Sequence, residues 1–433
     1  MKNARPATLE VIRMSPAARI SAFSRVTALA GKRPTHAAFA WLHGNPKKIM
    51  NWHAEVVEIP APPFGEQARA KWIAERFVEA GLVGVETDDI GNVLGFLNPP
   101  GHPPESTGHI VVVSAHLDTV FPAGTPINPR LTEKDGAERL EAPGACDNGA
   151  GIAGLLAVAY ALTHAKAELP VPLLFVGNVG EEGEGDLRGV RHLYASTLGS
   201  RIAAHIVLDG AGADSAVTQA LGSRRFQVAI SGPGGHSFTD AGTPNPIAAL
   251  AMALATLART PTPDEPRTTL NLGTIGGGTS VNSIPENAVA TIDFRSTSSD
   301  QLLRLEVALH RATEDAVEFA NAQAKSSGAR GRLAFKITKI GDRPAALLPS
   351  DSPLLEALRA VDRRLEIKTT IRLGSTDANI PLSLQVPALS LGAGGEGAGA
   401  HTQGEWYSSK GRELGLKRVL LLTLAVLDWA AEL

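Results

Sequence analysis

Residues 109–118 read HIVVVSAHLD, an apolar run that ends in a His-x-Asp pair formed by His116 and Asp118. A continuous apolar run of this length predicts a strand that is buried on both faces, as in the sheets of α/β proteins. In an open α/β sheet, the loops that leave the carboxyl ends of the strands converge on one edge, where ligand sites lie. The stretch therefore predicts an α/β fold with a functional site at the end of this strand.

Acidic or imidazole side chains also follow four other short apolar or glycine-rich segments. They are Asp147 after EAPGAC, Glu181 and Glu182 after VPLLFVGNVG, Asp209 after HIVL, and His401 after VPALSLGAGGEGAGA. Because such loops share one edge of a sheet, these side chains can meet although they are distant in sequence. Histidines combined with several carboxylates suit zinc, with cobalt or manganese as substitutes. We therefore expect a dinuclear metallohydrolase that binds two divalent metal ions.

Each position taken alone has a structural explanation. Asp147 precedes a Gly/Ala-rich helix, where an aspartate often caps the helix N-terminus. Glu181 and Glu182 fit a solvated acidic turn, and His116 fits a hydrogen-bonded histidine at a strand end. In the metal site, Asp118 is expected to accept the second imidazole N–H of His116, which presents the other ring nitrogen to a metal. The placement of every position at a strand-to-loop transition favours the metal site.

The composition limits the classes of partner. Charged residues make up 20% of the 433-residue chain and the formal net charge is −3, so no basic surface for nucleic acid or anionic lipid is expected. No apolar stretch approaches the ~20 residues that span a bilayer, which argues against a membrane role. The first residues lack the apolar core of a secretory signal, and the single cysteine, Cys146, cannot form an internal disulfide. We expect a cytoplasmic protein that acts on a small substrate.

The pattern of strands and helices predicts two domains and an extension. Residues 1–48 show weak helical periodicity and are expected to form an N-terminal extension. Residues 49–221 alternate strand-like and helical segments, and this pattern resumes over 341–433. Between them, residues 222–340 follow the order β-α-β-β-α-β, the split βαβ unit of a ferredoxin-like domain. We therefore predict a discontinuous catalytic domain that is interrupted by a smaller α+β domain.

Eight short motifs occur in order along residues 50–433. They are SAHLDTVFP, APGACDNGAGIAG, GNVGEEGEGDLRG, HIVLDG, GPGGHS, GGTSVNSIP, STDANIP and GAHTQGEWY. Together they resemble the zinc peptidases and amidohydrolases that include peptidase T, aminoacylase, carboxypeptidase G and succinyl-diaminopimelate desuccinylase. The resemblance implies a zinc-aminopeptidase-like catalytic domain with an inserted ferredoxin-like α+β domain. That inserted domain would serve as a lid and as the contact of a homodimer.

The resemblance also implies a role for each candidate metal ligand. Asp147 would bridge two metal ions. His116 and Asp209 would complete the ligands of one ion, and Glu182 and His401 those of the other. These assignments come from the matching motifs and predict that the five side chains lie close together in the structure.

Further roles follow from the same resemblance. Glu181 would be the general base, and His236 in GGHS would stabilise the oxyanion of the tetrahedral intermediate. Asn282, Arg295 and Arg343 match positions that contact substrate, since an arginine can bind a carboxylate through two hydrogen bonds. The alternative for Arg295 and Arg343 is a surface or interdomain salt bridge.

The motifs favour one substrate class over another. Asp209 stands where acylases and carboxypeptidases of the family often have Glu, and the region before His401 is most similar to peptidase T-like members. We therefore expect an aminopeptidase that acts on di- and tripeptides. The alternatives are an N-acyl-amino-acid amidohydrolase or a carboxypeptidase.

Three other functional classes fit the sequence less well. A serine hydrolase would carry a G-x-S-x-G nucleophile elbow, which the sequence lacks. A nucleotide-binding loop would follow the first strand of a βαβ unit, whereas GTIGGGTS lies between two predicted strands of the inserted domain. A metal-free binding protein on the same fold would be expected to have lost Glu181 or a metal ligand, and all of them are present.

Overall fold

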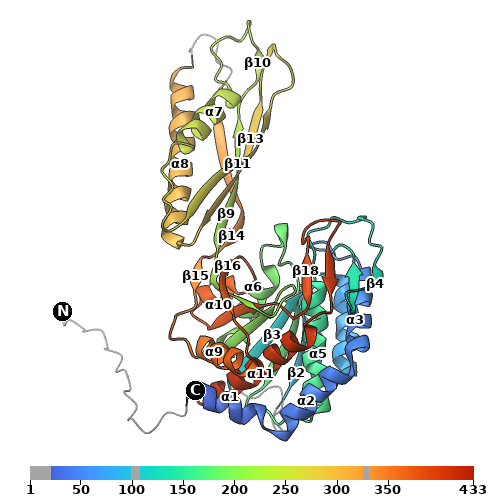
Figure 1. Cartoon of the computed structure of the whole chain (residues 1–433). Helices are drawn as coiled ribbons and strands as arrows, with labels where there is room; N and C mark the ends of the chain where they lie inside the picture. The colour runs from blue at the N-terminus through green and yellow to red at the C-terminus, as the bar shows by residue number, and fades with distance from the viewer. Residues whose placement is uncertain (1–20, 99–107, 325–330) are drawn as a thin grey trace, which may run out of the picture.

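The computed structural model describes residues 21–98, 108–324 and 331–433. Figure 1 shows a larger α/β part and a smaller α+β part that stand apart and are joined through β9 and β14. This mixed α/β architecture confirms the predicted fold class. Among the described residues, no helix combines the length and apolar character needed to cross a membrane.

A nine-stranded mixed sheet forms the centre of the larger part. Its strand order is β1-β2-β6-β3-β7-β17-β8-β15, and β16 also pairs with β8. β3, β6, β7 and β17 form the parallel centre of the sheet, so their carboxyl ends lie along the same edge. The strands are β1 (Val83–Thr87), β2 (Val93–Leu97), β3 (Ile110–His116), β6 (Leu173–Asn178), β7 (Ile202–Leu208), β8 (Ser215–Ala220), β15 (Ala346–Leu347), β16 (Thr370–Gly374) and β17 (Ala388–Leu391).

Helices cover both faces of this sheet. One face packs against a core that α5 and α11 dominate, and both helices are apolar around most of their circumference. The other face packs against a smaller cluster that includes Leu193 of α6. The helices of this part are α3 (Pro46–Glu58), α4 (Gln67–Glu79), α5 (Gly149–His164), α6 (Arg188–Ala195), α9 (Pro353–Leu365), α10 (Asn379–Ser383) and α11 (Arg412–Ala430).

The described part of the predicted extension packs against the larger part of the protein. α1 (Ala22–Ala30) contacts α9 and α11, and α2 (Arg33–Gly44) contacts α5. Val26 and Leu42 are buried in the main core. Residues 1–20 of the predicted extension lie outside the described residues. The segment from Ala22 to Gly44 therefore contributes two helices to the main core.

The smaller part, which we call the lid, has a four-stranded antiparallel sheet with the order β11-β13-β9-β14. Its two helices cover one face of the sheet and enclose a separate core around Phe226 and Phe294. β11 forms an edge of this sheet. The elements are β9 (Gly222–Ser231), α7 (Pro246–Leu257), β11 (Thr268–Gly277), β13 (Asn287–Ser296), α8 (Ser299–Ala322) and β14 (Ala334–Arg343), with the short pair β10 (Gly235–His236) and β12 (Ser283–Ile284).

A third sheet, which the sequence patterns did not predict, has the order β18-β19-β5-β4. It pairs a hairpin that precedes Asp147 with a hairpin that carries His401, and Trp406 faces Glu141 across the junction. The Arg139 guanidinium stacks 3.8 Å above the Trp406 ring in this junction. The sheet therefore joins two segments that bear candidate metal ligands. Its strands are β4 (Arg130–Lys134), β5 (Ala137–Glu141), β18 (Glu396–Ala398) and β19 (Trp406–Ser408).

Candidate metal centre

The candidate ligands meet where the parallel strands end. His116 is the last residue of β3, Glu181 and Glu182 follow β6, and Asp209 follows β7. His401 lies in the loop between β18 and β19. Three groups of potential metal ligands form there, and in each group the ligand atoms lie within 4.8 Å of one another. These groups are His116–Glu181–Glu182, His116–Asp147–Asp209 and Asp147–Glu182–His401.

Asp147 is shared by two of these groups, with one carboxylate oxygen directed to each histidine. Its Oδ1 lies 3.0 Å from Nε2 of His116, and its Oδ2 lies 3.0 Å from Nε2 of His401. The second imidazole is also 3.2 Å from Oε1 of Glu182. A carboxylate in this position can bridge two cations, each completed by a histidine and one further carboxylate. The structure thus brings close together the five side chains that the sequence motifs named as candidate ligands.

In the metal-free protein, several of the candidate ligands have raised pKa values, as expected for a site where cations would bind. Hydrogen bonds with Asp147 and Glu182 raise the pKa of His401 to about 10. Burial and, to a lesser extent, the neighbouring Asp147 charge raise the pKa of Asp209 to about 7. Burial alone would lower the pKa of His116, but Asp118 and Asp147 raise it well above its usual range. The bound protons offset the negative charge of the clustered carboxylates. Metal ions would provide the same neutralisation.

A buried oxygen atom that lacks a hydrogen bond also supports a metal site at Asp147. Asp147 Oδ1 is buried without a well-directed hydrogen bond, although it lies close to His116. Buried polar atoms normally have a partner, so an oxygen in this state is available to a cation. Nitrogen and carboxylate donors at this spacing are ligand types that zinc accepts.

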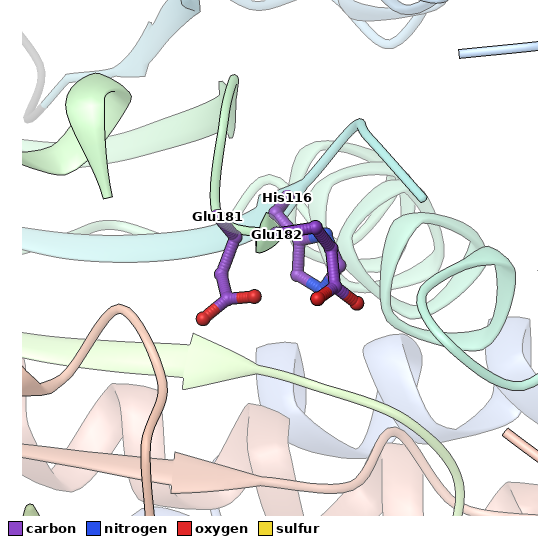
Figure 2. A group of neighbouring side chains, drawn as sticks. All are labelled: His116, Glu181 and Glu182. Carbon is purple, nitrogen blue, oxygen red and sulfur yellow. The ribbon is translucent and has the colours of Figure 1, made fainter. Parts of the chain in front are cut away.

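Glu181 and Glu182 are adjacent but face different ways. Figure 2 shows the Glu182 carboxylate beside the His116 ring and the Glu181 carboxylate turned away from it. Glu181 accepts a hydrogen bond from Nη1 of Arg343 over 2.9 Å, and its carbonyl oxygen accepts one from Nη2. Burial raises the pKa of Glu181 well above its usual range, while the Arg343 charge opposes the rise. The structure thus gives Arg343 the interdomain salt bridge that was the alternative to a substrate contact.

Asp118 supports the two glutamates through their backbone. Its Oδ1 accepts from the Glu181 N–H at 2.9 Å, and its Oδ2 accepts from the Glu182 N–H at 2.7 Å. The nearer acceptor for Nδ1 of His116 is the Asp118 carbonyl oxygen at 3.0 Å, whereas the carboxylate is 3.6 Å away. Asp118 therefore orients His116 mainly through its backbone, which differs from the contact expected from the sequence.

Three predicted residues lie in the lid and are not part of the ligand groups. His236 belongs to β10, which lies at the end of the lid farthest from the large sheet (Figure 1). Its Nδ1 accepts from the backbone N–H of Phe238 at 3.2 Å. Asn282 is nearby, and its carbonyl oxygen accepts from the Ser237 N–H at 3.0 Å. Arg295 on β13 forms a 2.8 Å ion pair with Asp293. Within one chain, His236 and Asn282 are not brought to the candidate metal centre.

Two buried carboxylates without a predicted role, Asp377 and Glu405, border the site. Asp377, in the motif STDANIP, is fully buried and accepts a 2.7 Å hydrogen bond from Nδ2 of Asn178. Burial raises its pKa to about 6. Glu405, in the motif GAHTQGEWY, is 1% exposed and contacts the loop that carries Asp147. A carboxylate in a loop is usually exposed to solvent, so the sequence around each residue gave no sign of burial. The motifs that contain Asp377 and Glu405 were the one sequence feature that pointed to them.

Two curated relatives show local sequence similarity. A probable carboxypeptidase of Aspergillus clavatus is 28% identical over 274 residues, which cover 58% of this chain and 58% of the relative. The cytosol non-specific dipeptidase of Escherichia coli K12 is 28% identical over 284 residues, which cover 60% of this chain and 56% of the relative. The chain thus spans little more than half the length of these relatives.

Solved structures share the fold over most of the chain. The aminopeptidase PepT of Bacillus cereus aligns with a TM-score of 0.68 at 19% identity and covers 89% of this chain and 99% of its own. A tripeptidase of Staphylococcus aureus gives 0.67 at 22% identity with the same two coverages. A dinuclear metal binding peptidase of Bacillus subtilis gives 0.62 at 17% identity, again over 89% and 99%. Residues 112–425 match peptidase family M20/M25/M40, which includes every candidate ligand from His116 to His401, and the chain belongs to this family.

Proposed function

We propose that this protein is a two-metal hydrolase of amide bonds in small substrates, and specifically an aminopeptidase that acts on di- and tripeptides. The observation that carries the proposal is the position of Asp147, whose two oxygens each lie 3.0 Å from a different histidine. In this proposal, His116 and Asp209 complete one metal position, and Glu182 and His401 complete the other. Zinc is the proposed metal, and cobalt or manganese are substitutes.

The chain's own residues have distinct tasks in the proposed reaction. A pair of bound divalent ions would polarise the substrate carbonyl and lower the pKa of an attacking water. Glu181 accepts the proton of that water and returns it to the leaving amine. Arg343 donates a hydrogen bond to the Glu181 carboxylate, and Asp118 fixes the backbone of the Glu181–Glu182 turn.

The substrate class is supported by the peptidase family and by the names of the relatives, which include a dipeptidase and carboxypeptidases. The lid offers a partly exposed guanidinium at Arg295, next to Asp293 and Arg225. Such a cation can bind a substrate carboxylate. The second candidate function is that of an N-acyl-amino-acid amidohydrolase or a carboxypeptidase. The names of the carboxypeptidase relatives favour the carboxypeptidase.

We further propose a homodimer in which the lid of one copy supplies His236 to the centre of the other. The lid tip is apolar around this residue, because Phe238 is 85% exposed and Val281 is fully exposed. Within the described part of the chain, strand β11 also has no neighbouring strand on one of its sides. Unpaired strand edges and exposed apolar side chains are features of surfaces that bind other chains. A cytoplasmic location remains part of the proposal.

The first test is metal analysis combined with hydrolysis of a substrate panel. Elemental analysis should find two metal ions per chain, and Asp147→Ala should lose both, because it removes a ligand from each position. The panel contains free-amine dipeptides, tripeptides and N-acetyl amino acids, before and after chelation. Chelator-sensitive cleavage of free-amine peptides supports the aminopeptidase, whereas preference for acetylated substrates supports the amidohydrolase. No metal and no cleavage after reconstitution would indicate a binding protein and contradict the proposal.

A further inference from the structure

Glu405 holds the loop that carries Asp147 by three backbone hydrogen bonds. Its Oε1 accepts from the N–H groups of Cys146 at 2.6 Å and Asp147 at 2.7 Å, and its Oε2 accepts from the Gly144 N–H at 2.8 Å. The Glu405 carbonyl oxygen also accepts from the Ala142 N–H at 3.1 Å. The side chain is 1% exposed, so these hydrogen bonds are protected from water.

Glu405 belongs to the same loop as His401. It lies four residues after this histidine and directly before β19, and β19 pairs with β5, the strand that leads into the Asp147 loop. Residues 399–404 are exposed, and His401 has a left-handed backbone with φ of 66°. The His401 loop therefore has little packing of its own, and Glu405 is its buried attachment to the Asp147 loop.

The other side of the Asp147 loop is attached without Glu405. The side chain of Asn148 accepts from the Gly210 N–H at 3.1 Å and donates to the Leu208 carbonyl at 2.9 Å, which ties the loop to the segment that carries Asp209. His53 Nε2 lies 2.6 Å from the Ala145 carbonyl oxygen. Without Glu405, these contacts would therefore still hold Asp147 in position beside Asp209.

We propose that Glu405 is a positioning residue that fixes His401 relative to Asp147, so that its removal weakens one of the two metal positions selectively. The affected position is the one formed by Asp147, Glu182 and His401, whereas the position formed by His116, Asp147 and Asp209 is retained. This inference rests on the proposed metal centre. Residues that orient metal ligands typically contribute roughly 10- to 100-fold to metal affinity.

The test compares Glu405→Ala, Glu405→Gln and a control variant by calorimetric titration of the metal-free protein with zinc. Glu405→Ala should bind one ion as tightly as the unaltered protein and the second ion roughly 10- to 100-fold more weakly. Glu405→Gln should fall between them, because an amide oxygen can still accept from Cys146 and Asp147 but the amide nitrogen cannot accept from Gly144. The control, Asp362→Asn, alters another buried carboxylate, which pairs with Arg418 at 2.7 Å. It should bind both ions normally.

Amide hydrogen exchange of the metal-free proteins provides a readout that does not depend on metal. In Glu405→Ala the N–H groups of Gly144, Cys146 and Asp147 should exchange roughly tenfold faster or more, as expected from the loss of a buried hydrogen bond. In Glu405→Gln the effect should be confined mainly to Gly144. Asp362→Asn should leave all three amides unchanged.

Several outcomes would overturn the inference. Unchanged affinities and exchange rates in both Glu405 variants would do so, as would equal weakening of both metal positions. Loss of metal in the control in proportion to its loss of melting temperature would show a general effect of stability. If the unaltered protein binds no metal, the proposed function fails, and the exchange data still decide whether Glu405 clamps the two loops.

Discussion

Arg343 holds Glu181 with both terminal nitrogens of its guanidinium, because Nη1 lies 2.9 Å from Oε1 and Nη2 donates to the carbonyl oxygen. Nη1 also donates to Oγ of Ser375 at 3.1 Å. Arg343 is the last residue of β14, the strand by which the chain returns from the lid to the larger part. The proposed base is therefore held by the segment that joins the two parts of the protein, and its orientation depends on that segment.

Arg343→Ala should shift the acidic limb of the pH dependence of kcat/KM to higher pH. Burial raises the pKa of Glu181, and the Arg343 charge opposes this rise, so removal of the charge raises the pKa further. The base must be ionised to accept a proton, and a higher pKa leaves less of it ionised at low pH. Arg343→Lys should shift the limb less, and Arg76→Ala, whose ion pairs are with Glu55 of α3 and Glu79 of α4, should leave it in place. An unshifted limb in Arg343→Ala would show that Arg343 does not act on the base.

Glu181→Gln should lower kcat by about 10²- to 10⁴-fold, the usual contribution of a general base. Both metal ions should stay bound, because the Glu181 side chain faces Arg343 and is not part of the two groups that share Asp147. Glu182→Gln, the matched variant at the neighbouring position, should lose one ion. Elemental analysis and steady-state kinetics of the two variants provide the comparison. Loss of metal from Glu181→Gln would mean that the roles of the two glutamates are exchanged.

Zinc affinity should increase with pH between pH 6 and pH 8. The pKa of His401 is raised to about 10 and that of Asp209 to about 7, so both carry protons in the metal-free protein at pH 6. Metal binding must release these protons, and each released proton changes the affinity by up to about tenfold per pH unit. Titrations in buffers with different ionisation enthalpies would count the protons. A zinc affinity that is constant over this range would contradict the proposed ligands.

Mixing of two inactive variants should restore activity if the lid acts on the partner's centre. His236→Ala retains intact metal ligands and base, whereas Glu181→Gln retains an intact His236. In a mixed dimer, one centre then combines the intact residues of both chains, so random mixing should restore about a quarter of the full activity. Each variant mixed with itself serves as the control. Absence of recovery, together with a monomer in analytical ultracentrifugation, would contradict the dimer proposal.

The positions of the candidate ligands could be predicted because local sequence determines them. His116 ends an apolar strand and Asp209 directly follows one, and parallel neighbours in a sheet place such ends together. The order of strands and helices in the lid could also be read from the sequence, since these segments have clear hydrophobic periodicity, although β9 pairs with the distant strands β13 and β14. In contrast, Arg130–Lys134 is a charged and exposed strand, so no hydrophobic pattern marks the third sheet.

Long-range contacts account for what the sequence did not indicate. Glu405 contacts Asp147 across 258 residues, and Arg343 contacts Glu181 across 162 residues. No local pattern distinguishes a buried carboxylate that accepts backbone hydrogen bonds from one that is exposed in a loop. The burial of α1 and α2 was missed for a similar reason, because only a few of their residues, such as Val26 and Leu42, enter the core.

The separation of His401 from the other ligands has a consequence for biosynthesis. Asp147 precedes this histidine by 254 residues and Glu182 precedes it by 219, and the whole lid is encoded between them. A nascent chain on the ribosome therefore contains His116, Asp147 and Asp209 long before the last ligand is translated. In the proposed metal centre, the ligands of one position are all translated once Asp209 has been added, whereas the second position must wait for His401.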